Sequence, residues 1–187
     1  MDRSNWYDLW VKKIDYIEYQ VSQFGKNAPN IRFSINYYIG MAETAISLVS
    51  NIKNYNYLTI SHKRINFKDK YSGMYNPLNF ILDIRVRDVS EYYKEKFFHD
   101  NVLISELITN IADYKMNSME ALLFFARLLF PTYYFDCYQE VLFGGIDEKE
   151  IVRYINKAEE YQLFLKEVYL FLRQYYDIPD IEWIIKT

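Results

Sequence analysis

The residues best suited to chemistry lie at the ends of two short apolar runs. His62 comes just after the β-prone run 57–60, and Asp83 comes just after a second such run at 78–82. Ionisable side chains at the ends of buried strands often point into a loop site or a hydrogen-bond network. If the two runs form a hairpin, we expect the polar residues that follow them to lie side by side and make a site.

Asp83 admits two roles. It could hold a metal ion, because hard cations such as Mg²⁺ take carboxylate oxygens as ligands. Alternatively, Asp83 or its neighbour Asp88 could form an ion pair that holds the hairpin to the next helix. The cations available for such a pair are Arg85 and Arg87. The spacing of these charges is compatible with both roles.

Few other side chains are candidates for chemistry. The second of the two histidines, His99, lies at a predicted helix junction, where we expect a structural or solvent-exposed role. The single cysteine, Cys137, excludes an intramolecular disulfide and a multi-cysteine zinc site. Its apolar neighbours predict a buried and inert thiol.

Composition narrows the fold class. The chain has 187 residues, which predicts one domain over residues 1–187. It contains only 5 glycines and 4 prolines, so folds that need a tight turn every ten residues are disfavoured and a mainly helical fold is expected. The net charge of −3 argues against nucleic-acid binding. No uncharged apolar run approaches the roughly 20 residues that span a bilayer, so we expect no membrane span.

Apolar periodicity predicts the elements that position these side chains. The helices are expected over 6–24, 29–52, 87–97, 100–111, 117–130, 134–143 and 148–176, with the hairpin inserted after the second. Asn117 with Glu120, and Asp147 with Glu150, have the spacing of capping boxes at two of these helix starts. The tail 178–185 is expected to pack back as an irregular strip.

Four stretches carry a family resemblance: SHKRI at 61–65, NPLNFILD at 76–83, RDVSEY at 87–92 and ARLLFPTYYFDC at 126–137. Together they resemble the C-terminal part of YutH-type spore coat-associated proteins, relatives of the CotS group. The resemblance covers most of the chain. It implies a fold like the large lobe of aminoglycoside phosphotransferases and choline kinases, which belong to the protein-kinase-like proteins.

The resemblance also implies roles for particular residues. His62 matches the histidine of the catalytic loop and Asp83 matches the metal-binding aspartate, but Arg64 stands where the catalytic aspartate is expected. Arginine cannot accept the proton of a substrate hydroxyl and would repel Mg²⁺. Asp69 falls near the position of the metal-binding asparagine. We therefore expect no catalytic residue and no cofactor, and only a vestigial cleft formed by His62, Asp69, Asp83, Arg87 and Asp88.

A kinase also needs a small lobe with a glycine-rich turn and a phosphate-binding lysine. The five glycines form no such motif. We therefore expect this chain to be a fragment that lacks the N-terminal small lobe and that does not transfer phosphate unaided.

The leading hypothesis is a non-catalytic, kinase-like lobe that contributes to assembly of the bacterial spore coat through protein contacts. Its partners would be coat proteins or the missing N-terminal lobe, with synthesis in the cytoplasm of the mother cell. One alternative is the lobe of a small-molecule phosphotransferase that uses ATP and Mg²⁺, with Asp83 holding the metal and Asp69 assisting. Another is a helical regulatory protein unrelated to kinases, which a helical or disordered 58–83 segment would support.

Overall fold

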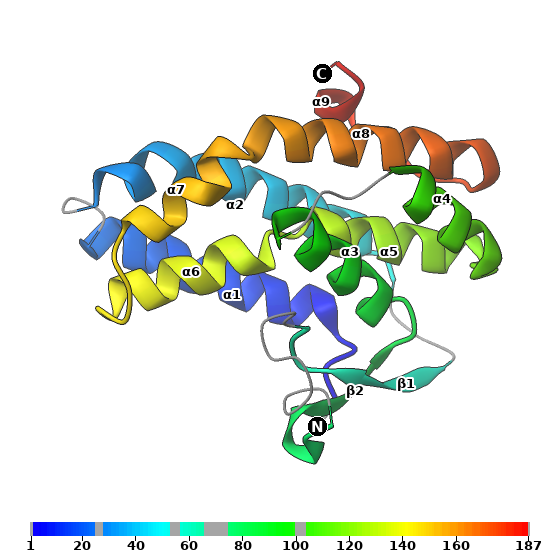
Figure 1. The fold of residues 1–187 in the computed structure, drawn as a ribbon, viewed down its shortest axis with the longest axis horizontal. Helices are drawn as coiled ribbons and strands as arrows, with labels where there is room; N and C mark the ends of the chain where they lie inside the picture. Colours follow the sequence, from blue (N-terminus) through cyan, green and yellow to red (C-terminus); the bar gives the residue numbers. More distant parts are fainter. Residues whose placement is uncertain (1, 25–27, 53–56, 66–74, 100–103, 187) are drawn as a thin grey trace.

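The structure, a computed structural model, describes residues 2–24, 28–52, 57–65, 75–99 and 104–186. Helices dominate these residues, and one two-stranded antiparallel sheet is inserted among them (Figure 1). The elements are α1 (Trp6–Phe24), α2 (Pro29–Val49), β1 (Leu58–His62), η2 (Pro77–Asn79), β2 (Phe80–Ile84), α3 (Arg87–His99), α4 (Ile104–Asp113), α5 (Ser118–Leu129), α6 (Thr132–Leu142), α7 (Lys149–Asn156), α8 (Ala158–Tyr175) and α9 (Glu182–Ile185). The predicted mainly helical fold with a small hairpin is confirmed.

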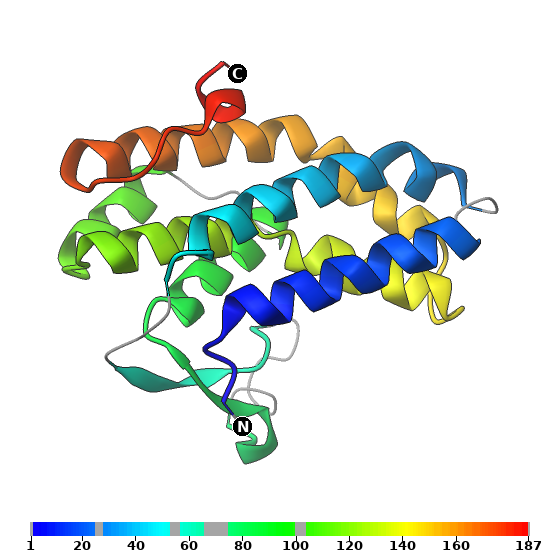
Figure 2. The ribbon, with the colours of Figure 1, turned by 180° about the vertical axis from the view of Figure 1, so that it is seen from behind.

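The central helix is α5. Its residues Leu123, Phe124, Phe125 and Ala126 follow one another and are all fully buried, so the middle of the helix is buried on every side. It packs against α2, α3 and α8. Helix α1 packs against α2, and Figure 2 shows these two helices next to each other on the side that faces away from the viewer in Figure 1. The hydrophobic core therefore surrounds α5.

Two predicted helix starts have different outcomes. At α5, the Asn117 side chain accepts a hydrogen bond from the backbone N–H of Glu120, and the reciprocal bond is present, so the predicted capping box is confirmed. At α7, the Asp147 carboxylate instead accepts from the N–H of Lys149 at 2.8 Å, and no capping box with Glu150 forms. The second prediction is wrong because the helix begins one residue too late for that spacing.

The single long helix predicted over 148–176 is also wrong. It is divided into α7 and α8 at Lys157, whose backbone has φ −95° and ψ 3°. The break lets α7 pack against α2 and α6 while α8 packs against α4 and α5. Tertiary packing here outweighs continuous helical periodicity. The tail is irregular as far as Ile181 and then forms the short helix α9.

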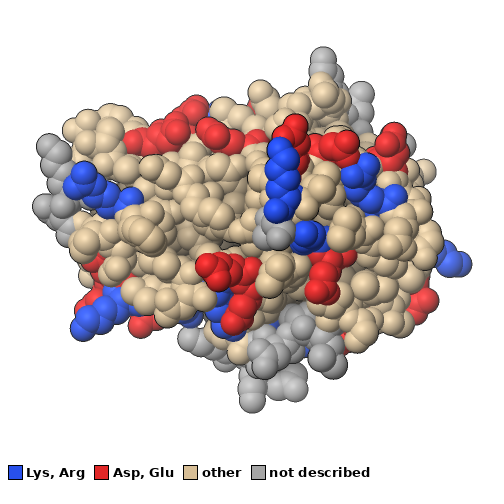
Figure 3. Space-filling model, turned by 90° about the horizontal axis from the view of Figure 1, so that it is seen from above, with Lys and Arg blue, Asp and Glu red and all other residues tan. Residues whose placement is uncertain are grey.

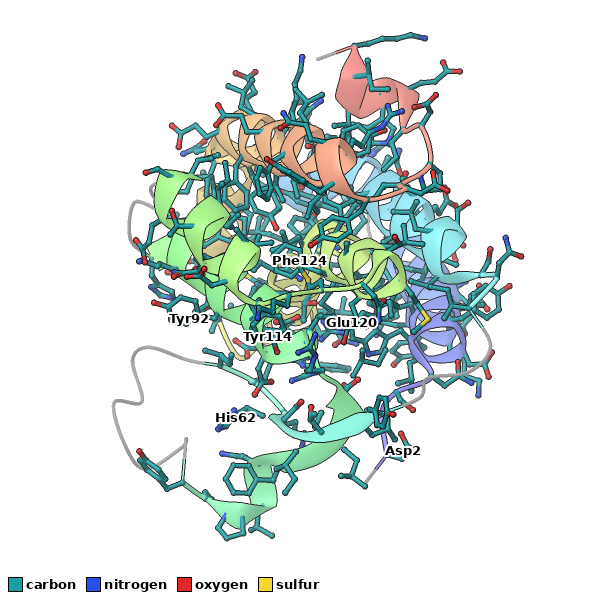
Figure 4. The ribbon with its side chains drawn as sticks, turned by 90° about the vertical axis from the view of Figure 1, so that its right-hand side faces the viewer. Asp2, His62, Tyr92, Tyr114, Glu120 and Phe124 are labelled. Carbon is teal, nitrogen blue, oxygen red and sulfur yellow. The ribbon has the colours of Figure 1, made fainter. Side chains whose placement is uncertain are left out.

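The hairpin lies on one side of the helical body, away from the C-terminus (Figure 1). The N-terminal residues run beside it: Asp2 forms a parallel bridge with Leu82, and the N–H of Arg3 donates to the Leu82 carbonyl at 2.9 Å. Figure 4 shows His62 on the sheet, Asp2 next to the sheet and Phe124 within the helical body. Residues 58–62 and 80–84 form strands. A helical or disordered hairpin segment would have supported an unrelated helical regulator, and these strands do not support it.

The two faces of the hairpin differ in exposure. Ser61, Ile81 and Asp83 are buried against the helices. Most of the alternate residues face outward, and Ile60 and Leu82 are 72% and 44% exposed, whereas Ile84 at the end of β2 is buried. The register pairs Ile60 with Leu82, so these apolar side chains are direct neighbours on the outer face. One face of the sheet is thus buried against the helices, and the other face exposes apolar side chains to solvent.

The surface seen from the α8 side carries both signs of charge scattered over mostly uncharged residues (Figure 3). No single-sign field of the kind that attracts a nucleic-acid backbone is visible on this face. Within the described residues, no helix is long and apolar enough to cross a membrane.

Candidate functional site

The hairpin register separates the two residues that were expected to meet. His62 is paired with Phe80, whereas Asp83 is paired with Thr59. In an antiparallel sheet the C-terminal ends of the strands lie at opposite ends of the ladder, so the predicted side-by-side arrangement is wrong. Three positions along a strand place the two residues about 10 Å apart.

Arg87, at the start of α3, joins the two ends of the hairpin. Its Nε lies 2.9 Å from Asp83 Oδ2, and its Nη1 donates to the backbone carbonyl of His62. Its Nη2 donates to the carbonyl of Lys63 at 2.8 Å, and Nη1 also lies 3.3 Å from Asp88 Oδ1. The arginine is 1% exposed. The predicted ion pair that holds the hairpin to the next helix is therefore confirmed.

The Asp83 carboxylate is enclosed by protein donors. Oδ1 accepts from the indole N–H of Trp6 at 2.8 Å and from the backbone N–H of Ile84 at 2.8 Å, while Oδ2 faces Arg87. Burial raises the pKa of Asp83, and the charges of Arg127 and Arg87 oppose that rise. Both oxygens are thus engaged by nitrogen donors.

This donor set does not fit Mg²⁺, which needs several oxygen ligands. Among the residues that the structure describes, no group of three or more His, Cys, Asp or Glu side chains is arranged to hold a metal ion. Asp69, expected in the cleft, lies outside the described residues.

His62 and Asp88 form a second pair beside Arg87. The His62 ring Nδ1 lies 2.7 Å from Asp88 Oδ2, and the same carboxylate accepts from the His62 backbone N–H at 3.0 and 3.1 Å. Asp88 therefore holds both the side chain and the backbone of His62, so it secures the end of β1 against α3.

Arg64, at the position where the resemblance expects a catalytic base, is bound to α6. Its Nε and Nη2 lie 2.8 and 3.2 Å from the two carboxylate oxygens of Asp136. Lys13 of α1 donates to the same carboxylate at 2.8 Å. Burial would raise the pKa of Asp136, but Lys13 and Arg64 outweigh it and lower that pKa. Arg64 thus ties the segment after β1 to α1 and α6.

Three further charged residues were missed by the sequence reasoning. Glu91, Lys94 and Arg127 are 0%, 1% and 6% exposed, respectively. Arg127 Nε lies 2.6 Å from Glu91 Oε1, and Lys94 Nζ lies 3.4 Å from the same oxygen. We call Asp83, Arg87, Glu91, Lys94 and Arg127 the charged junction. Positions 87, 91 and 94 are three or four residues apart, so their side chains lie on one face of α3 and alternate in sign. This pattern in the sequence could have indicated the cluster.

Lys94 also stabilises the end of α5. It donates to the backbone carbonyls of Arg127 at 2.5 Å and Phe130 at 2.8 Å, next to the Pro131 break between α5 and α6. These carbonyls lack helical partners, so a lysine is well suited to them. Desolvation lowers the pKa of Lys94 to about 7, although Glu91 opposes that shift.

Glu91 stays ionised in this setting. Burial alone would raise the pKa of its carboxyl group, but Arg127 and Lys94 outweigh burial and hold the pKa well below its usual range. The Arg127 guanidinium also lies over the rings of Trp6 and Trp10, 5.1 and 5.6 Å from their centroids. The junction therefore links α1, α3, α5 and the hairpin.

The remaining candidates have structural surroundings. His99 Nε2 lies 2.9 Å from Glu95 Oε1 one turn earlier in α3. Cys137 is buried, as predicted, and burial raises the pKa of its thiol to about 11, so the thiol is protonated at neutral pH.

Arg64 lines several hollows, and two of them adjoin the site residues. The smaller, about 200 Å³, lies between α1 and the charged junction. The larger, about 540 Å³, lies between α3, α6 and α7, and its carboxylates are Glu95, Asp136, Glu140, Asp147 and Glu150. The two hollows differ in charge, because the smaller is lined mainly by cations and the larger mainly by carboxylates.

Fold and site define a mainly helical lobe in which a hairpin is held by buried ion pairs. The chain belongs to the spore coat putative kinase YutH family, which matches residues 2–175, so the family resemblance is confirmed. It is 24% identical to the endospore coat-associated protein YutH of Bacillus subtilis strain 168. That match covers 97% of this chain and 61% of the relative, so the chain spans less than two thirds of the relative's length. No solved structure matches the chain.

Proposed function

We propose that the chain is a non-catalytic, kinase-like lobe, a pseudokinase, that contributes to the spore coat through protein contacts. Asp83 carries this proposal. The residue that the resemblance assigns to a metal uses one oxygen for Trp6 and Ile84 and the other for Arg87. A metal could bind there only by breaking a buried ion pair, which costs several kcal/mol.

Arg64 supports the same proposal. An aspartate at this position would accept a proton from a substrate hydroxyl, whereas the Arg64 guanidinium is paired with Asp136 and stabilises the packing of α1 and α6. The described residues of the expected cleft thus serve the fold. The relative and the family are both named for the spore coat, which supports a role in the coat for this chain.

The outer face of the hairpin is the surface that we propose for protein contact. Ile60 and Leu82 are exposed side by side, and Leu78, 86% exposed, lies on η2 just before β2. Exposed apolar patches of this kind commonly mark protein interfaces. The partner is either a coat protein or the N-terminal small lobe that the resemblance implies for full-length relatives.

Localisation tests the proposal. The chain, fused to a fluorescent protein and expressed in sporulating B. subtilis, should collect at the coat. Ile60→Glu should reduce this signal, because it places a charge in the proposed interface. Leu163→Glu, at a 52% exposed position on α8, is the matched control and should keep the signal. Uniform cytoplasmic fluorescence of the unaltered fusion would reject the coat role.

Calorimetry tests the lack of catalysis. The chain should bind ATP no better with Mg²⁺ than without it, and Asp83→Asn should leave any ATP binding unchanged. Magnesium-dependent binding that Asp83→Asn abolishes would favour the phosphotransferase alternative.

A further inference from the structure

The smaller hollow is strongly cationic. Five basic residues line it: Arg3, Lys13, Arg64, Arg87 and Arg127. Asp83 is the one carboxylate among the described residues of its lining. We call this space the cationic hollow.

Two of its arginines have hydrogen-bond donors without a protein acceptor. Arg127 has a side chain only 7% exposed, and its Nε is bound to Glu91, but no described residue accepts from its Nη1 or Nη2. The Nε of Arg3 is buried and has no partner among the described residues either. Of these atoms, Arg3 Nε is the one that is buried without a partner among the described residues, and leaving a buried donor unpaired costs about 1–3 kcal/mol. The unpaired Arg3 Nε, together with the Arg127 Nη atoms that line the same hollow, therefore indicates a ligand with acceptor oxygens.

Charge balance favours an anion. The basic residues of the hollow are paired with four carboxylates: Asp83, Asp88, Glu91 and Asp136. Arg3 adds a positive charge that none of these ion pairs includes. The five cations thus exceed the four carboxylates by one, and a bound anion would neutralise the excess.

The size of the hollow limits the ligand. About 200 Å³ corresponds to about seven water molecules at their liquid volume. Pockets that enclose drug-sized molecules start at about 300 Å³. The cationic hollow by itself therefore has room for a small tetrahedral oxyanion and is too small to enclose a whole nucleotide.

We propose that the cationic hollow binds a small oxyanion of the phosphate or sulfate type, held by the Nη atoms of Arg127 and by Arg3. Guanidinium groups match such ions with paired N–H donors. The bound ion would stabilise the packing of α1 on the charged junction, because Arg3 precedes α1 and Arg127 belongs to α5. This inference does not depend on the proposed coat role, and either can fail alone.

Tryptophan fluorescence provides a direct readout. Trp6 and Trp10 line the hollow, whereas Trp183 is bonded to Thr44 of α2, away from it. In a Trp183→Phe background, titration with sodium phosphate or sodium sulfate at constant ionic strength should give a saturable change. Sodium chloride and sodium acetate at the same ionic strength should give little change.

Variants assign the response to the hollow. Arg3→Gln should raise the Kd for phosphate about tenfold, because it removes one charge-assisted hydrogen bond. Arg127→Lys should weaken binding at least as much, since lysine has no forked donors. Arg32→Gln, at an exposed position on α2, is the control and should stay within about twofold of the parent. Circular dichroism checks that each variant is folded.

Three results would overturn the proposal. The first is the absence of any saturable response to phosphate and sulfate. The second is a response that both Arg3→Gln and Arg127→Lys leave unchanged, which would place the ion elsewhere. The third is tighter binding of ATP than of inorganic phosphate, which would show that the ligand is a nucleotide.

Discussion

The core around α5 and the charged junction are both buried, yet different forces hold them together. Around α5 the contacts are apolar and non-directional, so stability follows the area and volume that are buried. In the junction, each charge depends on particular partners, as Asp83 does on Trp6 and Arg87. We therefore expect the core to tolerate changes that conserve volume and the junction to tolerate almost none.

The largest effect is expected from Arg87→Met. This change leaves Asp83, 1% exposed, without its cation and should lower the free energy of unfolding by about 3–5 kcal/mol, measured by urea denaturation. Adding Asp83→Asn should restore part of the loss, because no unpaired charge then remains. A double variant whose loss equals the sum of the single losses would show that the two residues are not coupled.

Conservative substitutions are expected to affect the stability of the core less than that of the charged junction. In the core, Leu123→Met should cost less than about 1.5 kcal/mol, while Leu123→Ala, which creates a cavity, should cost about 2–5 kcal/mol. In the junction, Arg87→Lys should be as harmful as a cavity, because one ammonium group cannot reach all the acceptors of Arg87. Full stability of Arg87→Lys would contradict the comparison.

A change of one pH unit is expected to have a smaller effect on stability than the losses from Arg87→Met or Arg87→Lys. The pKa of Lys94 is about 7 in the folded chain, below the value of 10.5 for an unperturbed lysine. Between these values the unfolded chain binds more protons than the folded chain, so stability should rise from pH 7 to pH 9.5 by about 1 kcal/mol per unit. Above that range, the raised pKa values of buried tyrosines such as Tyr38 act in the opposite direction.

Urea denaturation at several pH values measures this slope. Lys12→Met, at an exposed position on α1, is the control and should keep the slope. A slope that is flat or falls between pH 7 and 9.5 would show that Lys94 remains charged in the folded protein.

Local patterns made much of the fold predictable. The spacing of apolar residues located α1, α2, α3 and α5, and the Asn117–Glu120 capping box located the start of α5. These signals act over one or two helical turns, so they can be recognised without knowing the fold. The division at Lys157 was missed because it depends on which neighbours α7 and α8 pack against.

The candidate site was predictable only in part. His62, Asp83, Arg87 and Asp88 were recognised as a polar group near the hairpin, and the ion pair was one of the two stated alternatives. Their arrangement was not, because antiparallel pairing separates His62 from Asp83 and only Arg87 reaches both. Glu91 and Lys94 were overlooked because charged residues on a helix are usually exposed.

By itself, the sequence determined that the chain is mainly helical and carries a short hairpin. It also determined that arginine stands at position 64, where the family resemblance leads us to expect an aspartate. Only the tertiary structure decided that Asp83 is enclosed, because its partner Trp6 lies 77 residues away along the chain. It also decided that Arg127 faces a hollow with unpaired donors. Periodicity reports which side of an element is buried, whereas hydrogen bonds between distant elements form only when the whole chain has packed.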